Sequence, residues 1–119
     1  MRCKHAAAAV LLLMMFPALF ISAQAATIVD CIHPRGVTEK TICAHEELRK
    51  TDEELGILET RLEGLLPKED TMARRELSTG RYRFTKFLRM CGRDIACLKK
   101  AYEHRLKQIR AWLAKVEKK

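Results

Sequence analysis

Apolar residues recur along this chain three and four positions apart, which is the spacing of amphipathic helices, and no segment alternates as a β-strand would. The first long stripe is made of leucines: Leu48, Leu55, Leu58, Leu62 and Leu65. Thr51 fills the one polar gap in that stripe, and Pro67 ends the predicted helix. Upstream, residues 26–37 form an irregular arm, after which Thr38 is expected to cap a short helix over residues 39–44.

The chain after Pro67 carries two further helical stripes. The first steps by four and three residues through Ala73, Leu77, Gly80, Phe84, Phe87 and Cys91. Gly80 marks either a close helix contact or a kink. Asp94 is expected to cap the last helix, whose stripe is Ile95, Leu98, Tyr102, Leu106, Ile109, Leu113 and Val116. The sequence therefore predicts an all-α fold, a small antiparallel helical bundle of three long helices plus a short N-terminal helix.

Two aromatic residues of the last helix have alternative interpretations. Tyr102 and Trp112 lie on or beside its apolar stripe, so we interpret both as core or stripe-edge residues. In the alternative, Trp112 belongs to an exposed partner patch with Arg110 and Lys115.

The N-terminal segment has the features of a secretory signal peptide. It has a positively charged start, an apolar run over residues 6–21 and an Ala-Gln-Ala cleavage motif that ends at Ala25. An uncleaved membrane anchor is the alternative, but the run is shorter than the roughly 20 residues that a bilayer requires. We expect residues 1–25 to be removed and residues 26–119 to form a single exported domain, periplasmic or secreted.

Removal of the signal peptide leaves an even number of cysteines: Cys31, Cys43, Cys91 and Cys97. In a small exported domain such a set predicts disulfides, although four cysteines allow three pairings. We favour Cys31 with Cys43 and Cys91 with Cys97, because each bond then staples the entry to a helix. A repeated Cys-x-His unit, which includes His33 and His45, offers zinc ligands as an alternative, but disulfide formation would remove the thiolates. We expect no metal and no cofactor.

Charge divides the chain, whose formal net charge is +8. Residues 26–80 hold eight Lys and Arg against twelve Asp and Glu, whereas residues 81–119 hold thirteen against three. Two candidate partner-binding faces follow, an acidic face of Glu53, Glu54, Glu59 and Glu63 and a basic face of Arg81, Arg83, Lys86 and Arg89. In the alternative, these charges are solvated faces that pair with one another between neighbouring helices.

Residues suited to catalysis are scarce. Ser78 is the one serine after the signal peptide, and the cysteines are expected to be bonded. Glu53 and Glu54 are adjacent on a helix, so their carboxylates point in different directions. No nucleic-acid-binding motif is present in the sequence. We therefore expect a protein that binds a partner rather than an enzyme.

The cysteine-bearing segments carry a resemblance to a known family. The matching positions are Asp30-Cys31, Glu39, Ile42-Cys43, Leu48, Asp52, Leu55, Cys91-Gly92, Cys97-Leu98, Tyr102, Arg105, Leu106 and Ile109. This pattern resembles the LprI-type lysozyme-inhibitor domain family of exported bacterial proteins, over nearly the whole mature chain. The chain departs from the family's Gln-Arg-x-Trp-Leu run, where it reads Arg81-Tyr82-Arg83-Phe84-Thr85, and Glu59 stands where a tyrosine is usual.

The resemblance implies a periplasmic or surface helical domain, of a family in which some members inhibit lysozyme. Lysozyme acts through two carboxyl groups in its cleft, so an inserted Arg or Lys would mimic displaced substrate while the acidic face meets the basic enzyme. The alternative is an envelope protein whose basic C-terminal half binds anionic polymers or phospholipid headgroups. Against that alternative, the apolar stripes are all expected in the bundle seam, with no spare face for lipid.

The disulfides yield a prediction about stability. Loops as short as those we favour stabilise a protein by about 2 to 3 kcal/mol each. Reduction of the purified protein should therefore lower its melting temperature by several degrees or more, as measured by circular dichroism with and without a phosphine reductant. An unchanged transition would show that the bundle does not depend on these bonds.

Overall fold

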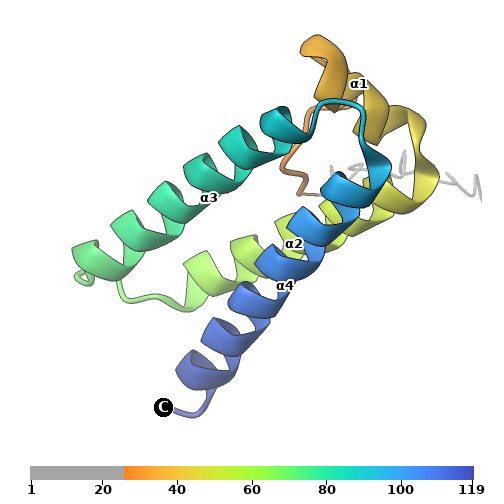
Figure 1. Cartoon of the computed structure of the whole chain (residues 1–119). Coiled ribbons are helices and arrows are strands. Elements are labelled where there is room, and N and C mark those ends of the chain that lie inside the picture. The colour runs from red at the N-terminus through yellow and green to blue at the C-terminus, as the bar shows by residue number, and fades with distance from the viewer. Residues whose placement is uncertain (1–25) are drawn as a thin grey trace, which may run out of the picture.

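Four helices account for most of residues 26–119, the part of the chain that the computed structural model describes. Their bounds are α1 Gly36–Ala44, α2 Glu46–Leu65, α3 Thr71–Cys91 and α4 Ile95–Glu117 (Figure 1). The described residues contain no strand, so the predicted all-α class with one short and three long helices is confirmed. The predicted signal peptide, residues 1–25, lies outside the described residues.

The long helices alternate in direction, so α2 and α4 run parallel to each other and α3 runs antiparallel to both (Figure 1). Ion pairs follow this direction, since Glu47 pairs with Lys99 near the start of α2 and α4, and Arg61 pairs with Glu117 near their ends. The most extensive helix contact is between α2 and α4, and α3 contacts α4 more than α2. The α2–α4 pair is therefore the main body of the bundle.

The buried seam of α2 differs from the predicted leucine stripe. Leu48, Leu55 and Leu62 are buried as expected, but Leu65 is 44% exposed. The polar positions of the seam are occupied by Asp52 and Glu59 rather than by Thr51, and these two side chains are almost completely buried. The prediction of an apolar stripe with one threonine was wrong, because two carboxylates with partners in the core occupy seam positions.

The stripe of α3 is also rotated from its predicted position. Leu77, Phe84 and Cys91 are buried as predicted, but Leu88 is buried in place of Phe87, which is 49% exposed. On α4, the predicted stripe holds, and Phe84 of α3 meets Tyr102 edge to face with ring centroids 5.2 Å apart. The outward position of Phe87 leaves an apolar side chain available at the surface.

The favoured cysteine pairing is confirmed. Cys31–Cys43 joins the N-terminal arm to α1, and Cys91–Cys97 closes the turn between α3 and α4. Gly92 in that turn has φ +60°, a left-handed conformation that glycine adopts without strain. The Cys91–Cys97 disulfide therefore joins the end of α3 covalently to the first turn of α4.

Helix caps agree with the sequence at one predicted position and differ at another. Asp94 caps α4 as predicted, since its carboxylate accepts the Cys97 N–H at 3.1 Å. Thr38 is not a cap, because α1 begins at Gly36 and Thr38 is buried inside the helix. The earlier start lets Thr38 face α3, where its hydroxyl lies 3.5 Å from the Arg89 carbonyl oxygen.

The N-terminal arm crosses α2 at Gly56. A Cβ atom built on this glycine would lie 2.6 Å from the carbonyl carbon of Ala26 and 3.0 Å from the Cα of Thr27. These neighbours are backbone atoms, which cannot rotate away as a side chain would. Gly56 is thus required for the arm to reach its place on α2.

Within α1–α4, no helix has an apolar stretch long enough to cross a bilayer.

The close approach of the arm predicts that substitution by Ala destabilises the protein at Gly56 but not at Gly64, which lies on the same helix. Gly56→Ala should lower the free energy of unfolding by about 1 to 3 kcal/mol, because the new methyl group displaces the arm. Gly64→Ala, where nothing lies within 4 Å of the built Cβ, should leave stability unchanged or raise it by up to about 1 kcal/mol. Urea denaturation of both variants measures the difference, and equal effects would contradict the predicted clash.

Candidate functional site

Asp52 lies at the centre of a buried hydrogen-bond cluster that joins three segments. Its Oδ2 accepts the backbone N–H groups of Ile28 and Val29, each at 3.1 Å, and its Oδ1 accepts the Tyr102 hydroxyl at 2.8 Å. Burial raises the pKa of Asp52, and these hydrogen bonds partly offset the increase. Burial and the neighbouring Asp52 also raise the pKa of Tyr102, so its hydroxyl keeps the proton that it donates.

Glu59 forms a second buried cluster with two arginines from different helices. Its Oε1 accepts from Nε of Arg105 at 2.9 Å, and its Oε2 accepts from Nε of Arg81 at 2.6 Å. Arg105 fits because Gly80 of α3 has no side chain, and a Cβ there would lie 2.7 Å from Nη1 of Arg105. The interpretation of Gly80 as a close helix contact is confirmed. The cluster therefore connects α2, α3 and α4.

The predicted acidic face does not exist as one exposed surface. Glu59 is fully buried, so its place on a docking face was wrong. Glu54 pairs with Arg110 of α4, and Glu53 is half-buried. Glu63 remains exposed. Much of the acidic charge of α2 is thus satisfied by the neighbouring helices, as the alternative interpretation of paired faces expected.

The predicted basic face is largely retained. Arg81 is engaged by Glu59, but Arg83 and Lys86 are exposed and form no ion pair within residues 26–119. Arg89 is also exposed, and its nearest carboxylate is that of Glu39 at 3.9 Å. Arg83, Lys86 and Arg89 therefore point their charge toward solvent from one helix.

Apolar side chains accompany this charge on α3. Met72, Tyr82 and Met90 are 82%, 69% and 77% exposed, and Phe87 is about half exposed. The expectation that the apolar stripes would leave no spare face was wrong for Phe87, because the buried face of α3 passes through Phe84, Leu88 and Cys91 instead. An amphipathic surface with basic and apolar residues is thus present on α3.

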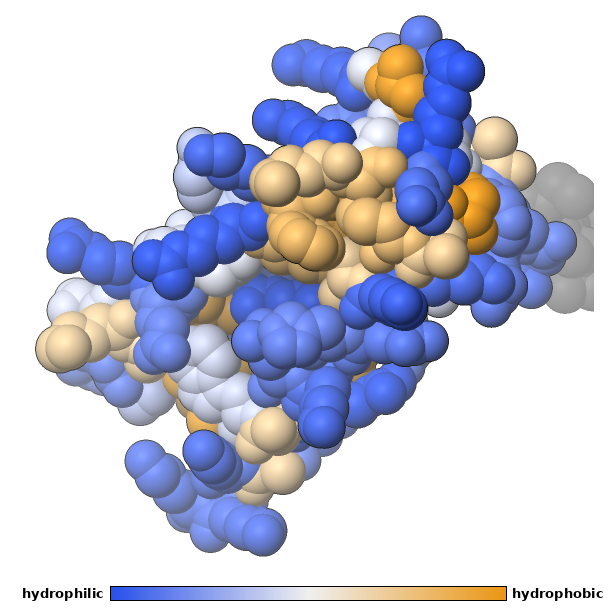
Figure 2. All heavy atoms as spheres, viewed as in Figure 1, coloured by the Kyte–Doolittle hydropathy of each residue, from blue (hydrophilic) through white to orange (hydrophobic). Residues whose placement is uncertain are grey.

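A groove of about 1670 Å³ runs between α3 and α4. Phe84, Phe87, Ile109 and Trp112 supply apolar lining, and the basic residues that line it are Arg75, Arg83, Lys100, Arg105 and Lys115. Figure 2 shows an apolar patch between the C-terminal half of α3 and the N-terminal half of α4, bordered by hydrophilic side chains. Trp112 is partly buried against the core, which confirms its predicted stripe-edge position. The groove is a candidate binding site.

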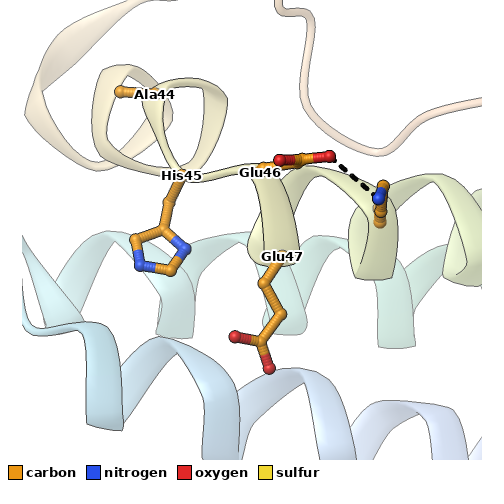
Figure 3. Close-up of a pocket in the computed structure, with 5 residues that line it drawn as sticks. Ala44, His45, Glu46 and Glu47 are labelled. Carbon is orange, nitrogen blue, oxygen red and sulfur yellow. Dashed lines mark ion pairs between the residues drawn. The ribbon is translucent and has the colours of Figure 1, made fainter.

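A smaller hollow lies where α1 meets α2 and is lined by Ala44, His45, Glu46, Glu47 and Lys50. Figure 3 shows that the His45 ring and the Glu47 carboxylate project to one side, while Glu46 turns away and pairs with Lys50. The neighbouring Cys43 is bonded to Cys31, so neither sulfur is a thiolate ligand for zinc. Across the described part of the chain, no three His, Cys, Asp or Glu side chains form a possible metal site.

The sequence did not assign Phe87, Arg75 or Lys100 to a groove, and it did not identify Asp52 and Arg105 as buried partners. The burial of the two carboxylates could have been detected, because Asp52 and Glu59 continue the four- and three-residue spacing of Leu48, Leu55 and Leu62. No family model, curated protein or solved structure matches this chain.

The Asp52 cluster predicts a difference between the two tyrosines of the chain. Tyr102→Phe removes the donor to Oδ1 of Asp52 and should lower the free energy of unfolding by about 1 to 3 kcal/mol. Tyr82→Phe deletes the same atom from an exposed ring and should change stability by less than about 0.5 kcal/mol. Thermal and urea unfolding measure both variants. Equal losses would show that the buried hydrogen bond does not contribute to stability.

Proposed function

We propose that this chain is an exported, non-enzymatic protein that acts by binding at the cell envelope. The signal-peptide pattern of residues 1–25 supports export, and the two disulfides are compatible with an oxidising location. The charged surface and the open groove support binding. Neither buried cluster offers a reactive group to solvent, since both carboxylates are engaged inside the core.

The ligand that the geometry supports best is anionic, and the basic surface of α3 binds it. The observation that carries this proposal is the asymmetry of pairing: four of the six glutamates of α2 form ion pairs, whereas Arg83 and Lys86 of α3 have no ion-pair partner in residues 26–119. Polymer phosphates or phospholipid headgroups would supply the missing charge. Exposed Met90 beside Arg89 adds apolar contact at a membrane surface.

Lysozyme inhibition is the second candidate function. The resemblance to the LprI-type family supports it, and so does the corner between α3 and α4. Arg93 is exposed in a turn that the Cys91–Cys97 disulfide clamps on both sides. Because the disulfide restrains the backbone of this turn, only the Arg93 side chain would have to become ordered when it pairs with a carboxylate in an enzyme cleft. The acidic residues Glu53 and Glu63 would then lie on a separate surface, α2.

A cell-wall lysis assay separates the two candidates. Oxidised, exported protein is titrated into lysozymes of several types, alongside Arg93→Glu, a triple Arg83/Lys86/Arg89→Glu variant and a triple Glu53/Glu54/Glu63→Lys variant. Near-stoichiometric inhibition that Arg93→Glu abolishes would establish lysozyme as the partner. Loss of inhibition in the Glu53/Glu54/Glu63→Lys variant would place the contact on α2.

The same proteins are mixed with phosphatidylglycerol vesicles and, separately, with soluble polyphosphate. We expect salt-sensitive binding that falls at least tenfold in the α3 triple variant, because three attractive charges become repulsive. Binding to vesicles alone would identify headgroups, and binding to both would identify phosphate in general. Absence of lysozyme inhibition and of binding to either anion would overturn both candidates.

A further inference from the structure

The groove between α3 and α4 is long enough to lie along several turns of a helix. Its lining on α3 extends from Met72 to Phe87, which corresponds to about 23 Å at 1.5 Å per residue. Along α4 the lining extends from Asp94, the N-cap of that helix, to Lys115, and the two helices run antiparallel. The groove is therefore an open trough between two helical walls, with Trp112 near one end.

The trough is apolar along its floor and positively charged along its edges. The half-exposed Phe87 and the partly buried Trp112 supply accessible apolar surface, above the buried side chains of Phe84 and Ile109. Four basic residues that line it form no ion pair within the described residues: Arg75, Arg83, Lys100 and Lys115. Only two acidic residues line it, Glu76 and Asp94, and the carboxylate of Asp94 already caps α4.

We propose that this groove receives an amphipathic helix of a partner protein, with Asp and Glu flanking its apolar stripe. Such a helix would place apolar residues at i, i+3, i+4 and i+7 against Phe87 and Trp112. Its flanking carboxylates would reach Arg83 on one wall and Lys100 on the other. Charge complementarity therefore selects an acidic helix, and the inference goes beyond binding of anions by the outer surface of α3.

Two other occupants fit less well. A second copy that docks by the same face would bring Arg83 and Lys100 against the same charges of its partner, so repulsion opposes it. An acyl chain would lie against polar lining residues such as Thr79, His104 and Gln108, which it cannot hydrogen-bond. The polar edges of a helix offer those side chains partners.

The test uses the single tryptophan of the chain as its reporter. The oxidised, exported protein is titrated with a synthetic helical peptide of about 18 residues that lacks Trp, with Leu at helical spacing and Glu on the flanks. We expect saturable binding with a blue shift of Trp112 emission. Phe87→Ala and Arg83→Glu should each weaken this binding about tenfold, through lost apolar contact and reversed charge.

Matched controls lie on the same helix but outside the groove. Lys86→Glu makes the charge change of Arg83→Glu, and Met90→Ala truncates an exposed apolar side chain as Phe87→Ala does. Both controls should change the affinity for the peptide by less than twofold. Because all four residues are exposed or half-exposed, unchanged far-UV circular dichroism is expected and is measured for every variant.

Several results would overturn the proposal. The first is the absence of a shift in Trp112 emission, and the second is an equal shift with a scrambled peptide of the same composition. The third is a loss of peptide affinity in Lys86→Glu as large as that in Arg83→Glu. Phosphatidylglycerol vesicles that shift Trp112 in an Arg83-dependent way, when the peptide does not, would identify a lipid site instead. Loss of vesicle binding in Lys86→Glu with peptide binding intact would separate this groove from the anion-binding surface of α3.

Discussion

The burial of two carboxylates in the seam of α2 is the constraint on which the rest of the fold depends. A buried charge without partners is so unfavourable that the surrounding chain must supply them. Asp52 obtains them from the N-terminal arm and from Tyr102, and Glu59 obtains them from Arg81 and Arg105. Because these partners come from the arm, α3 and α4, the carboxylates specify which segments meet α2 and in what register.

This internal pairing also explains where charge remains for binding. The sequence divides into an acidic N-terminal part and a basic C-terminal part, and the parallel packing of α4 on α2 brings the two together. Lys99 and Arg110 of α4 are thereby paired with α2. The helix α3 has little contact with α2, and of its basic residues only Arg81 forms an ion pair with that helix, whereas Arg83 and Lys86 have no ion-pair partner in residues 26–119. The basic surface therefore lies on α3 because α4, not α3, makes the extensive contact with the acidic helix α2.

Local features of the fold were predictable from the sequence, and non-local ones were not. The end of α2 before Pro67, the Asp94 cap and the two short disulfide loops depend on neighbouring residues, which a pattern records directly, although α1 was predicted to start at residue 39 and begins at Gly36. The burial of Glu59 depends on Arg105, 46 positions away, so a helical periodicity that scores Glu as polar assigns it to the surface. The groove is likewise non-local, because it is formed by residues of α3 and α4 that are distant in the sequence, so no local pattern predicts it.

That spacing links the core to the candidate site. Gly80 and Arg105, which meet beside Glu59, also line the groove. At this level a guanidinium held by a buried carboxylate fills the space between α3 and α4, where most helix pairs use interlocking apolar side chains. Arg105 is held at this level by the hydrogen bond from its Nε to Oε1 of Glu59 and by the ion pair between them. The Glu59 cluster therefore contributes Arg105 to the wall of the trough, and residues that specify the bundle also shape its candidate binding surface.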